Sequence, residues 1–301
     1  MEATIEVKNL KKKFVKKGIF RKRVREVLKG VSFEVFKETF GFIGPNGAGK
    51  TTTIKLIMGF LRPDSGSVRV LGRHIEEAKA FIGFLPERPY IYSSIKAIEF
   101  LNFCFDVFSI PYYERRRKAK ELLELVGLLG KEEEPISSFS KGMVQRLLFA
   151  STLVNDPEVL ILDEPMSGLD PVGRSMIAEV ILELRRKGKT VFYSSHIIQD
   201  VERLSDRVAV IVDGQIKLMG KVGEIVNRYL KGYRITYREG RELLTAEVGK
   251  EELWRKLEEL KSKRVELISV EPLRLTLEEV FVRLVKGESL EELSSSQVNL
   301  Q

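Results

Sequence analysis

A glycine-rich stretch, Gly-Pro-Asn-Gly-Ala-Gly-Lys-Thr at residues 44–51, constrains this chain most. It fits the pattern G-x-x-x-x-G-K-[ST] and follows a short apolar segment, residues 38–44, with helical spacing after it. Glycines let backbone N–H groups approach phosphates without side-chain clashes, and the N-terminus of the next helix attracts the same anion. The sequence therefore predicts a phosphate-binding loop (P-loop) between a strand and a helix.

The P-loop residues have distinct expected roles. We expect Lys50 to reach the β- and γ-phosphates of a nucleotide and Thr51 to hold Mg²⁺ through its hydroxyl. Kinases, GTPases, recombinases, helicases and transport motors all use such a loop, so it does not by itself select a function. The other expected nucleotide contacts are Gly44, Pro45, Asn46, Gly47, Ala48, Gly49 and Thr52.

Composition and charge narrow the class of protein. The 301 residues are 43% hydrophobic and 31% charged, which favours two domains or one large α/β domain with an appendage. No apolar run reaches the roughly 18 residues that span a bilayer, and we see no signal peptide, so we expect a cytoplasmic protein. The single cysteine, Cys104, is typical of a reducing compartment and is interpreted as helix packing. The net charge of +8 indicates either a solvated surface or a patch facing an anionic membrane.

Hydrophobic periodicity predicts an α/β fold. Antiparallel strands at 3–8 and 27–36, joined by an extended hairpin loop, precede the P-loop, and a continuous apolar segment at 158–165 is typical of a buried parallel strand. We therefore expect a P-loop NTPase core with a parallel sheet, an N-terminal antiparallel strand group and a helical insert. The expected domains are an ATPase domain at 1–220 with its insert at about 88–155, a small α+β domain at 221–286, and a flexible tail at 287–301. Helical spacing predicts helices at 140–154 and 173–189 in the first domain and at 250–263 and 276–287 in the second.

An acidic pair ends the apolar strand at 158–165. Asp163 should lie at the carboxyl edge of the sheet, where such folds bind their ligands, and we expect it to bind Mg²⁺ directly or through water. Glu164 follows it and could orient a water against the γ-phosphate as a general base. The pair therefore indicates nucleotide hydrolysis.

The stretch Phe-Ser-Lys-Gly-Met at 139–143, followed by Val-Gln-Arg, distinguishes between the P-loop classes. It resembles L-S-G-G-Q-x-Q-R, the signature of the ATP-binding cassette (ABC) ATPases. The resemblance implies that Ser140 and Gly142 lie at a helix N-terminus and contact the γ-phosphate held by the other subunit. Lys141 and Met143 depart from the signature, so the usual glutamine contact is not expected at Met143.

Further elements of the family follow in order. Asp170, within Ser-Gly-Leu-Asp-Pro at 167–171, matches the key acid of the D-loop, and His196 matches the histidine that senses the γ-phosphate. Phe14 matches the aromatic residue that stacks on adenine, which is usually a tyrosine. Glu87 stands where the family has a glutamine, and its carboxylate could help to hold Mg²⁺.

The resemblance, which covers about residues 3–220, implies a function. It implies an ATPase that uses ATP and Mg²⁺ and forms a head-to-tail homodimer, or a heterodimer with a paralogue. Polytopic membrane subunits would dock near the helical insert, placing the chain peripherally on the cytoplasmic face of the cell membrane. Residues 270–285 resemble the closing segment of ABC ATPases that serve small exporters of drugs, lipids or polysaccharides.

One alternative stays open at this point. A soluble ABC ATPase could act on the ribosome, on DNA or on a metal-cluster assembly complex. We expect no nucleic acid partner, because the basic segment at 8–29 lacks the interleaved aromatic residues of a base-stacking surface. The sequence predicts no particular cargo.

Overall fold

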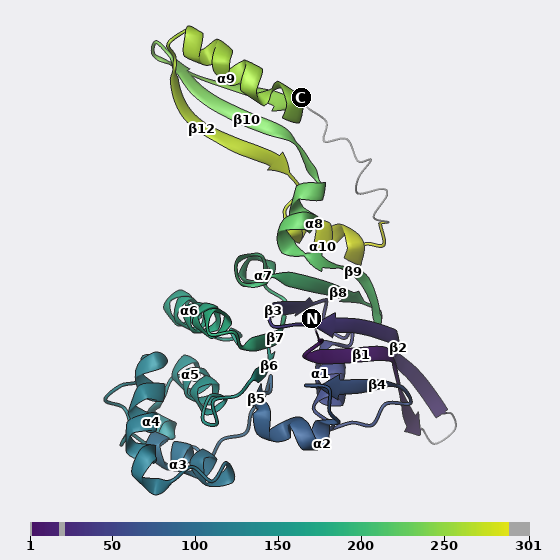
Figure 1. Cartoon of the computed structure of the whole chain (residues 1–301), viewed down its shortest axis with the longest axis vertical. Coiled ribbons are helices and arrows are strands. Elements are labelled where there is room, and N and C mark those ends of the chain that lie inside the picture. The colour runs from purple at the N-terminus through teal and green to yellow at the C-terminus, as the bar shows by residue number, and fades with distance from the viewer. Residues whose placement is uncertain (1, 18–21, 289–301) are drawn as a thin grey trace. The chain divides into compact units, whose positions relative to one another are not determined.

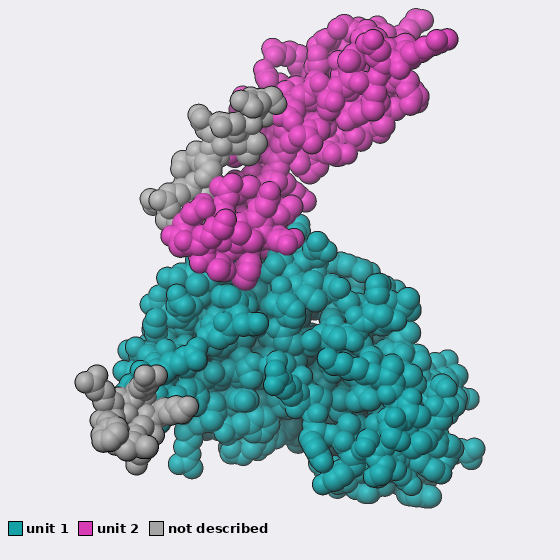
Figure 2. Space-filling view, turned by 180° about the vertical axis from the view of Figure 1, so that it is seen from behind, with its two compact units in different colours: residues 1–220 teal, residues 221–301 magenta. Residues whose placement is uncertain are grey.

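The computed structural model describes residues 2–17 and 22–288. The chain divides into two compact units, residues 1–220 and 221–301, which Figure 2 shows in different colours. The expected tail lies outside the described residues from 289 onward. No helix in the described ranges is both long enough and apolar enough to cross a membrane.

The first unit contains a central sheet of six strands, in the order β5-β6-β7-β3-β8-β9. The neighbours from β5 to β8 along this order are paired in parallel. Parallel strands align their carboxyl ends at one edge, which is where such sheets place their ligands. The strands are β3 (Thr39–Ile43), β5 (Ile82–Leu85), β6 (Val159–Asp163), β7 (Thr190–Ser195), β8 (Arg207–Val212) and β9 (Gln215–Lys221).

A second, antiparallel sheet has the order β2-β1-β4. Its strands are β1 (Ile5–Lys17), β2 (Lys22–Val35) and β4 (Ser65–Val70). The ladder between β1 and β2 continues to the pairs Phe14↔Arg25 and Val15↔Val24, well beyond the strands predicted at 3–8 and 27–36. Segments predicted as a loop are therefore part of a long, paired hairpin.

Aromatic packing joins the two sheets of the first unit. Phe33 on β2 stacks on Phe40 of β3 and on Phe192 of β7, with ring centroids 5.8 and 5.7 Å apart. All three rings are buried, together with Phe42 and the aliphatic side chains of both sheets. This shared core fixes the antiparallel hairpin against the strand that leads into the P-loop.

Helices surround the central sheet of the first unit. The predicted helical insert appears in Figure 1 as a group of three helices, α3 (Ala97–Val107), α4 (Tyr112–Leu125) and α5 (Lys141–Ser151), beside β5. The others are α1 (Lys50–Ile57), α2 (Ile75–Ala78), α6 (Pro171–Arg186) and α7 (Ile198–Leu204), with short 3-10 turns at Lys79–Phe81 and Ile136–Ser138.

The second unit is a small α+β structure. Its antiparallel sheet has the order β11-β10-β12, formed by β10 (Leu230–Glu239), β11 (Glu242–Gly249) and β12 (Glu266–Arg274). Helices α9 (Leu253–Ser262) and α10 (Leu277–Val285) were predicted, whereas α8 (Val222–Arg228) was not. The two units together confirm the predicted fold class.

Candidate nucleotide-binding site

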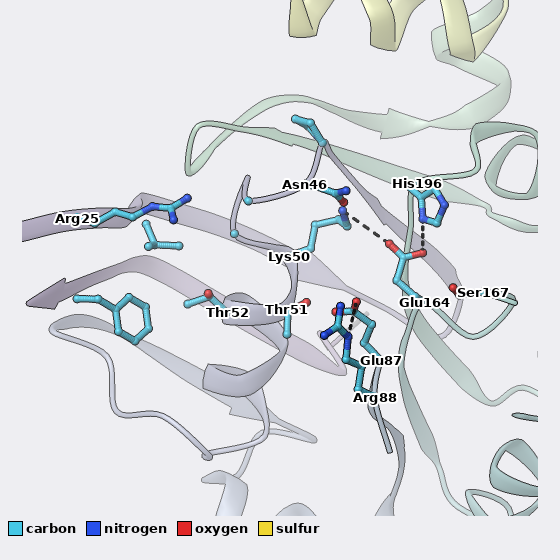
Figure 3. A pocket seen from close by; sticks show the side chains of 15 residues that line it. Arg25, Asn46, Lys50, Thr51, Thr52, Glu87, Arg88, Glu164, Ser167 and His196 are labelled. Carbon is cyan, nitrogen blue, oxygen red and sulfur yellow. Dashed lines mark hydrogen bonds and ion pairs between the residues drawn. The ribbon is translucent and has the colours of Figure 1, made fainter. Parts of the chain in front are cut away.

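A cleft of about 600 Å³ lies where the hairpin, the P-loop and the carboxyl ends of the central strands meet. Figure 3 shows that side chains from these separate segments point into one space. The lining consists of Phe14, Arg25, Val27, Pro45, Asn46, Gly47, Gly49, Lys50, Thr51, Thr52, Glu87, Arg88, Glu164, Ser167 and His196.

The backbone of the P-loop requires glycine where it turns into α1. Gly47 and Gly49 have φ of 80° and 115°, and a Cβ atom on Gly49 would lie 2.6 Å from the Leu28 side chain. Gly49 is the N-cap of α1 and offers no side-chain acceptor, so the first N–H groups of the helix stay available to an anion. The loop therefore has the geometry of a phosphate cradle.

Lys50 has two oxygen neighbours in this structure. Its Nζ donates a 2.7 Å hydrogen bond to the carbonyl oxygen of Gly44 and lies 3.7 Å from the Glu164 carboxylate. The side chain is almost fully buried. A buried ammonium group held by one carbonyl and one carboxylate is well placed to bind phosphate oxygens in the cleft.

Asp163 lies at the end of β6 and is buried. Its carboxylate accepts a 2.6 Å hydrogen bond from Ser194 on the neighbouring strand β7, and the Thr51 hydroxyl also hydrogen-bonds to it. Burial raises the pKa of Asp163, the negative charges of Glu87 and Glu164 raise it further, and the two hydroxyl hydrogen bonds oppose the rise. The carboxylates of Glu87 and Glu164 are thus each close enough to Asp163 for their charges to repel its own.

Glu164 occupies a left-handed backbone conformation, with φ of 54°. Its N–H donates to the Ser194 hydroxyl at 3.0 Å, and its carboxylate lies 2.7 Å from Nδ1 of His196, which follows β7. Figure 3 shows Lys50 and His196 meeting this one carboxylate from two sides. Glu164 and His196, both predicted as catalytic, are therefore in direct contact, and Lys50, the third residue predicted as catalytic, is paired with the same carboxylate.

The oxygen ligands fit a magnesium ion shared with a nucleotide. Thr51 supplies a hydroxyl, and Asp163 and Glu87 supply carboxylates, which are the hard donors that Mg²⁺ prefers. Within the described ranges no group of three His, Cys, Asp or Glu side chains could hold a metal unaided. Magnesium in nucleotide sites commonly uses one or two carboxylates together with phosphates and water.

The hairpin forms another wall of the cleft. Phe14 is 41% exposed, lines the cleft, and has the ammonium of Lys12 at 5.7 Å from its ring centroid. Arg25 pairs with Phe14 across the ladder and also lines the cleft, beside Val27. This wall offers an aromatic face and a guanidinium group to a bound molecule.

The remaining predicted residues do not line the cleft. Ser140 is the N-cap of α5, where its hydroxyl accepts from the Met143 N–H at 3.2 Å, and Gly142 lies beside Leu169. Asp170 is the N-cap of α6 and accepts from the Gly173 N–H at 2.8 Å. Gly44 and Ala48 belong to the P-loop but contribute no lining, and Asp163 lies beneath the surface of the cleft.

Four lining residues were not among the predicted site residues: Arg25, Val27, Arg88 and Ser167. Ser167 lies in the stretch already associated with the D-loop, and Arg88 follows Glu87, so proximity in sequence could have identified both. Arg25 and Val27 depend on the register of the hairpin, which pairs Arg25 with Phe14. A correct strand pairing would have revealed them.

The cleft combines a P-loop, an Asp-Glu pair at the end of a strand, and a histidine after the neighbouring parallel strand. This combination defines the site of a P-loop nucleoside triphosphatase. The model of the family described as ABC transporter matches residues 28–167. An uncharacterized ABC transporter ATP-binding protein from Synechocystis sp. is 37% identical over 293 residues, covering 91% of this chain and 82% of that protein. The chain therefore belongs to the ATP-binding proteins of ABC transporters and is an ABC ATPase.

Two further comparisons agree with this assignment. A fluoroquinolones export ATP-binding protein from Mycobacterium tuberculosis is 38% identical over 237 residues, covering 76% of this chain and 77% of that protein. Among solved structures, a dimeric bacterial ABC transporter cassette superposes with a TM-score of 0.66 at 25% identity, covering 72% of this chain and 98% of that one.

Proposed function

We propose that two copies of this chain, or one copy and a paralogue, close head-to-tail around two ATP molecules and hydrolyse them. Closing and opening would power export through separate membrane subunits. In this proposal residues 1–220 are the ATPase domain, with its helical insert at about 88–155, and residues 221–286 are an accessory domain.

One observation supports the shared site above all others. The cleft gathers the P-loop, Glu164 and His196, but its lining contains neither Ser140 nor Gly142. Those two residues lie at the N-terminus of α5, an 11-residue helix whose first N–H groups and dipole favour an anion. A second copy could therefore supply them to the γ-phosphate bound by the first.

The residues of the cleft suggest how hydrolysis proceeds. Lys50 leaves the Gly44 carbonyl and the Glu164 carboxylate to bind the β- and γ-phosphates. This frees Glu164 to accept a proton from the attacking water. His196, hydrogen-bonded to Glu164, orients that carboxylate and reports the presence of the γ-phosphate. Asp170, which caps α6, keeps the D-loop in place at the interface.

Thr51, Asp163 and Glu87 would hold Mg²⁺ in this cleft. When bound, the ion would neutralise phosphate charge and the charge of Asp163, whose pKa is raised by burial and by the negative charges of Glu87 and Glu164. Glu87 adds a negative charge where the family has a neutral glutamine. We therefore expect this chain to bind nucleotide more tightly with Mg²⁺ than without it.

The helical insert is the proposed docking region for the membrane subunits. Several large aromatic side chains in and beside it are mostly exposed, which is typical of a surface that contacts a partner. Export as the direction of transport is supported by the relative from Mycobacterium tuberculosis, named as an export protein. Such docking would place the chain on the cytoplasmic face of the membrane. The exposed aromatic residues are Tyr90, Tyr92, Phe103, Tyr112 and Tyr113.

Copurification tests the transporter role. The tagged chain is recovered from detergent-solubilised native membranes with ATP and Mg²⁺ present, and its partners are identified by mass spectrometry. We expect a polytopic membrane protein in stoichiometric amount. Recovery with ribosomes, nucleic acid or a soluble assembly factor instead would contradict the transporter role and leave the ATPase chemistry intact.

Substitution of the proposed base tests the chemistry. Glu164→Gln keeps the shape of the side chain but cannot accept the proton, so we expect ATP hydrolysis to fall by about 100-fold or more with ATP affinity retained. Glu121→Gln, an exposed change on α4, is the matched control and should hydrolyse ATP normally. Full turnover by Glu164→Gln would remove Glu164 from the role of base.

A further inference from the structure

We propose that Arg25 is a phosphate-binding residue of the nucleotide site. Its guanidinium group, on the hairpin, is a second cation besides Lys50 that binds the phosphate chain held by the P-loop. The inference rests on the proposed function, because it assumes that the cleft binds a nucleotide. It adds a residue on β2 to a site otherwise built from the P-loop and the ends of the central strands.

The register of the hairpin directs Arg25 into the cleft. Arg25 is paired with Phe14 across the β1–β2 ladder, and residues directly opposite each other in a ladder project from the same face of the sheet. Both side chains line the cleft. The face that presents an aromatic ring to the cleft therefore presents a guanidinium group beside it.

The guanidinium group also reaches the P-loop backbone. Arg25 Nη2 lies 3.2 Å from the position that a Cβ atom on Gly47 would occupy. Gly47 has φ of 80° and lies in the middle of the loop whose N–H groups bind phosphates. In Figure 3 the side chain of Lys50 lies between Arg25 and Glu164. A phosphate chain in the loop would thus meet Arg25 on one side and Lys50 on the other.

Arg25 differs from Lys12 and Lys13, two nearby cations of the hairpin, in its lack of a partner. Lys12 is paired with Asp64, and Lys13 is paired with Glu26. Within the part of the chain that the structure describes, the Arg25 side chain makes no hydrogen bond and no ion pair. It therefore needs to break no existing contact before it binds an anion.

The chemistry of the guanidinium group favours phosphate over the nucleoside. Its planar array of donors matches two phosphate oxygens at once, and the hydrogen bonds are strengthened by both charges. The ribose and adenine are neutral and offer no such gain. Because the Phe14 ring lies next to Arg25, contact with the nucleoside is the outcome that the experiment must distinguish.

Calorimetric titration of the full-length chain with three probes makes this distinction. ATP, ADP and inorganic pyrophosphate are titrated into the native chain, Arg25→Ala, Arg25→Lys and Lys50→Ala. Lys29→Ala is the matched control, because Lys29 is an exposed cation on the same strand but does not line the cleft. Circular dichroism verifies that every variant is folded.

We expect Arg25→Ala to weaken the binding of all three probes by the same factor, roughly tenfold. Arg25→Lys should recover part of the affinity, since it restores the charge without the planar donor array. Lys29→Ala should bind within about twofold of the native chain, as expected for an exposed charge with no contact to the ligand.

Two results would overturn the inference. Weaker ADP binding with unchanged pyrophosphate binding would place Arg25 on the nucleoside, and unchanged binding of all three probes would give it no role. Lys50→Ala separates this from failure of the proposed function. If Lys50→Ala loses affinity and Arg25→Ala does not, only the inference fails, whereas unchanged binding by both variants would remove the nucleotide site itself.

Discussion

The negative charge of Asp163, at the centre of the site, destabilises the folded chain. It is buried, and its pKa is raised by that burial and by the neighbouring carboxylates. Ionisation of a group whose pKa is raised on folding favours the unfolded chain. This destabilisation is absent at a pH well below about 3.9, the ordinary pKa of Asp. It is fully present once the pH exceeds the pKa of Asp163 in the folded chain.

The substitution Asp163→Asn removes this buried charge. Without nucleotide, we expect the variant to unfold at a temperature a few degrees higher than the native chain at pH 7, because the buried charge is gone. Calorimetric scans at several pH values should show this gain shrinking as the pH falls toward 4. ATP hydrolysis should be lost, since the neutral amide replaces a proposed magnesium ligand.

Asp156→Asn is the control for this substitution. Asp156 is exposed and its φ of 47° is one that asparagine also tolerates, so the exchange should change the unfolding temperature little. A lower unfolding temperature for Asp163→Asn than for the native chain at pH 7 would show that the buried charge does not destabilise the folded chain. It would mean that the ionised carboxylate stabilises the folded chain through Ser194 and Thr51.

At the scale of elements, Arg146 ties α5 to the end of α4. Its guanidinium group donates to the carbonyl oxygens of Val126 and Gly127, at 2.7 and 3.1 Å, just after α4 ends. These are acceptors that a helix C-terminus leaves without an internal partner. The residue therefore holds the proposed γ-phosphate-binding helix against its neighbour in the helical insert.

We expect Arg146→Met to lower the free energy of unfolding by about 1–2 kcal/mol, because charge-assisted hydrogen bonds to two carbonyls are lost at a partly exposed site. Urea denaturation measures the change. Arg117→Met, which removes an exposed pair with Glu121 on α4, should cost less than about 0.5 kcal/mol. Equal effects of the two changes would show that Arg146 does not join the helices.

The helices and strands differ in how accurately the sequence predicted their positions. The parallel strands and long helices carry strong periodicity, so β6, α5 and α6 were expected where they lie. The outer hairpin was expected as a loop, because Val15 and Val24 are 55% and 61% exposed and give the ladder no buried face to mark it. Helix α8 is only seven residues long, which leaves too few turns for a clear apolar stripe.

The residues of the site also differ in how well the sequence predicted that they would lie together. The P-loop, Asp163, Glu164 and His196 follow strands that are parallel neighbours, so motif order alone predicted that they would meet. Arg25 reaches the cleft because of the register in which β1 and β2 pair, and a single sequence does not specify that register. For Ser140, the motif predicts a contact that a single chain does not make. The family motif predicts a phosphate contact, and within one chain its hydroxyl caps α5.

For the molecule as a whole, we propose that one chain holds half of each ATP site. The cleft contains the P-loop half, and the N-terminus of α5 carries the other half outside its lining. If two copies share two nucleotides, ATP acts as the bond between them, and removal of the γ-phosphate weakens that bond. Dimerisation should therefore depend on ATP and on Ser140.

Light scattering of Glu164→Gln with ATP and Mg²⁺ measures this dimerisation, because slow hydrolysis preserves the closed state. We expect a mass of twice 34.4 kDa with ATP and of 34.4 kDa with ADP. Adding Ser140→Asn, which keeps a helix cap but removes the hydroxyl, should abolish the dimer without weakening ATP binding to the single chain. A chain that binds ATP and stays at 34.4 kDa throughout would contradict the shared site.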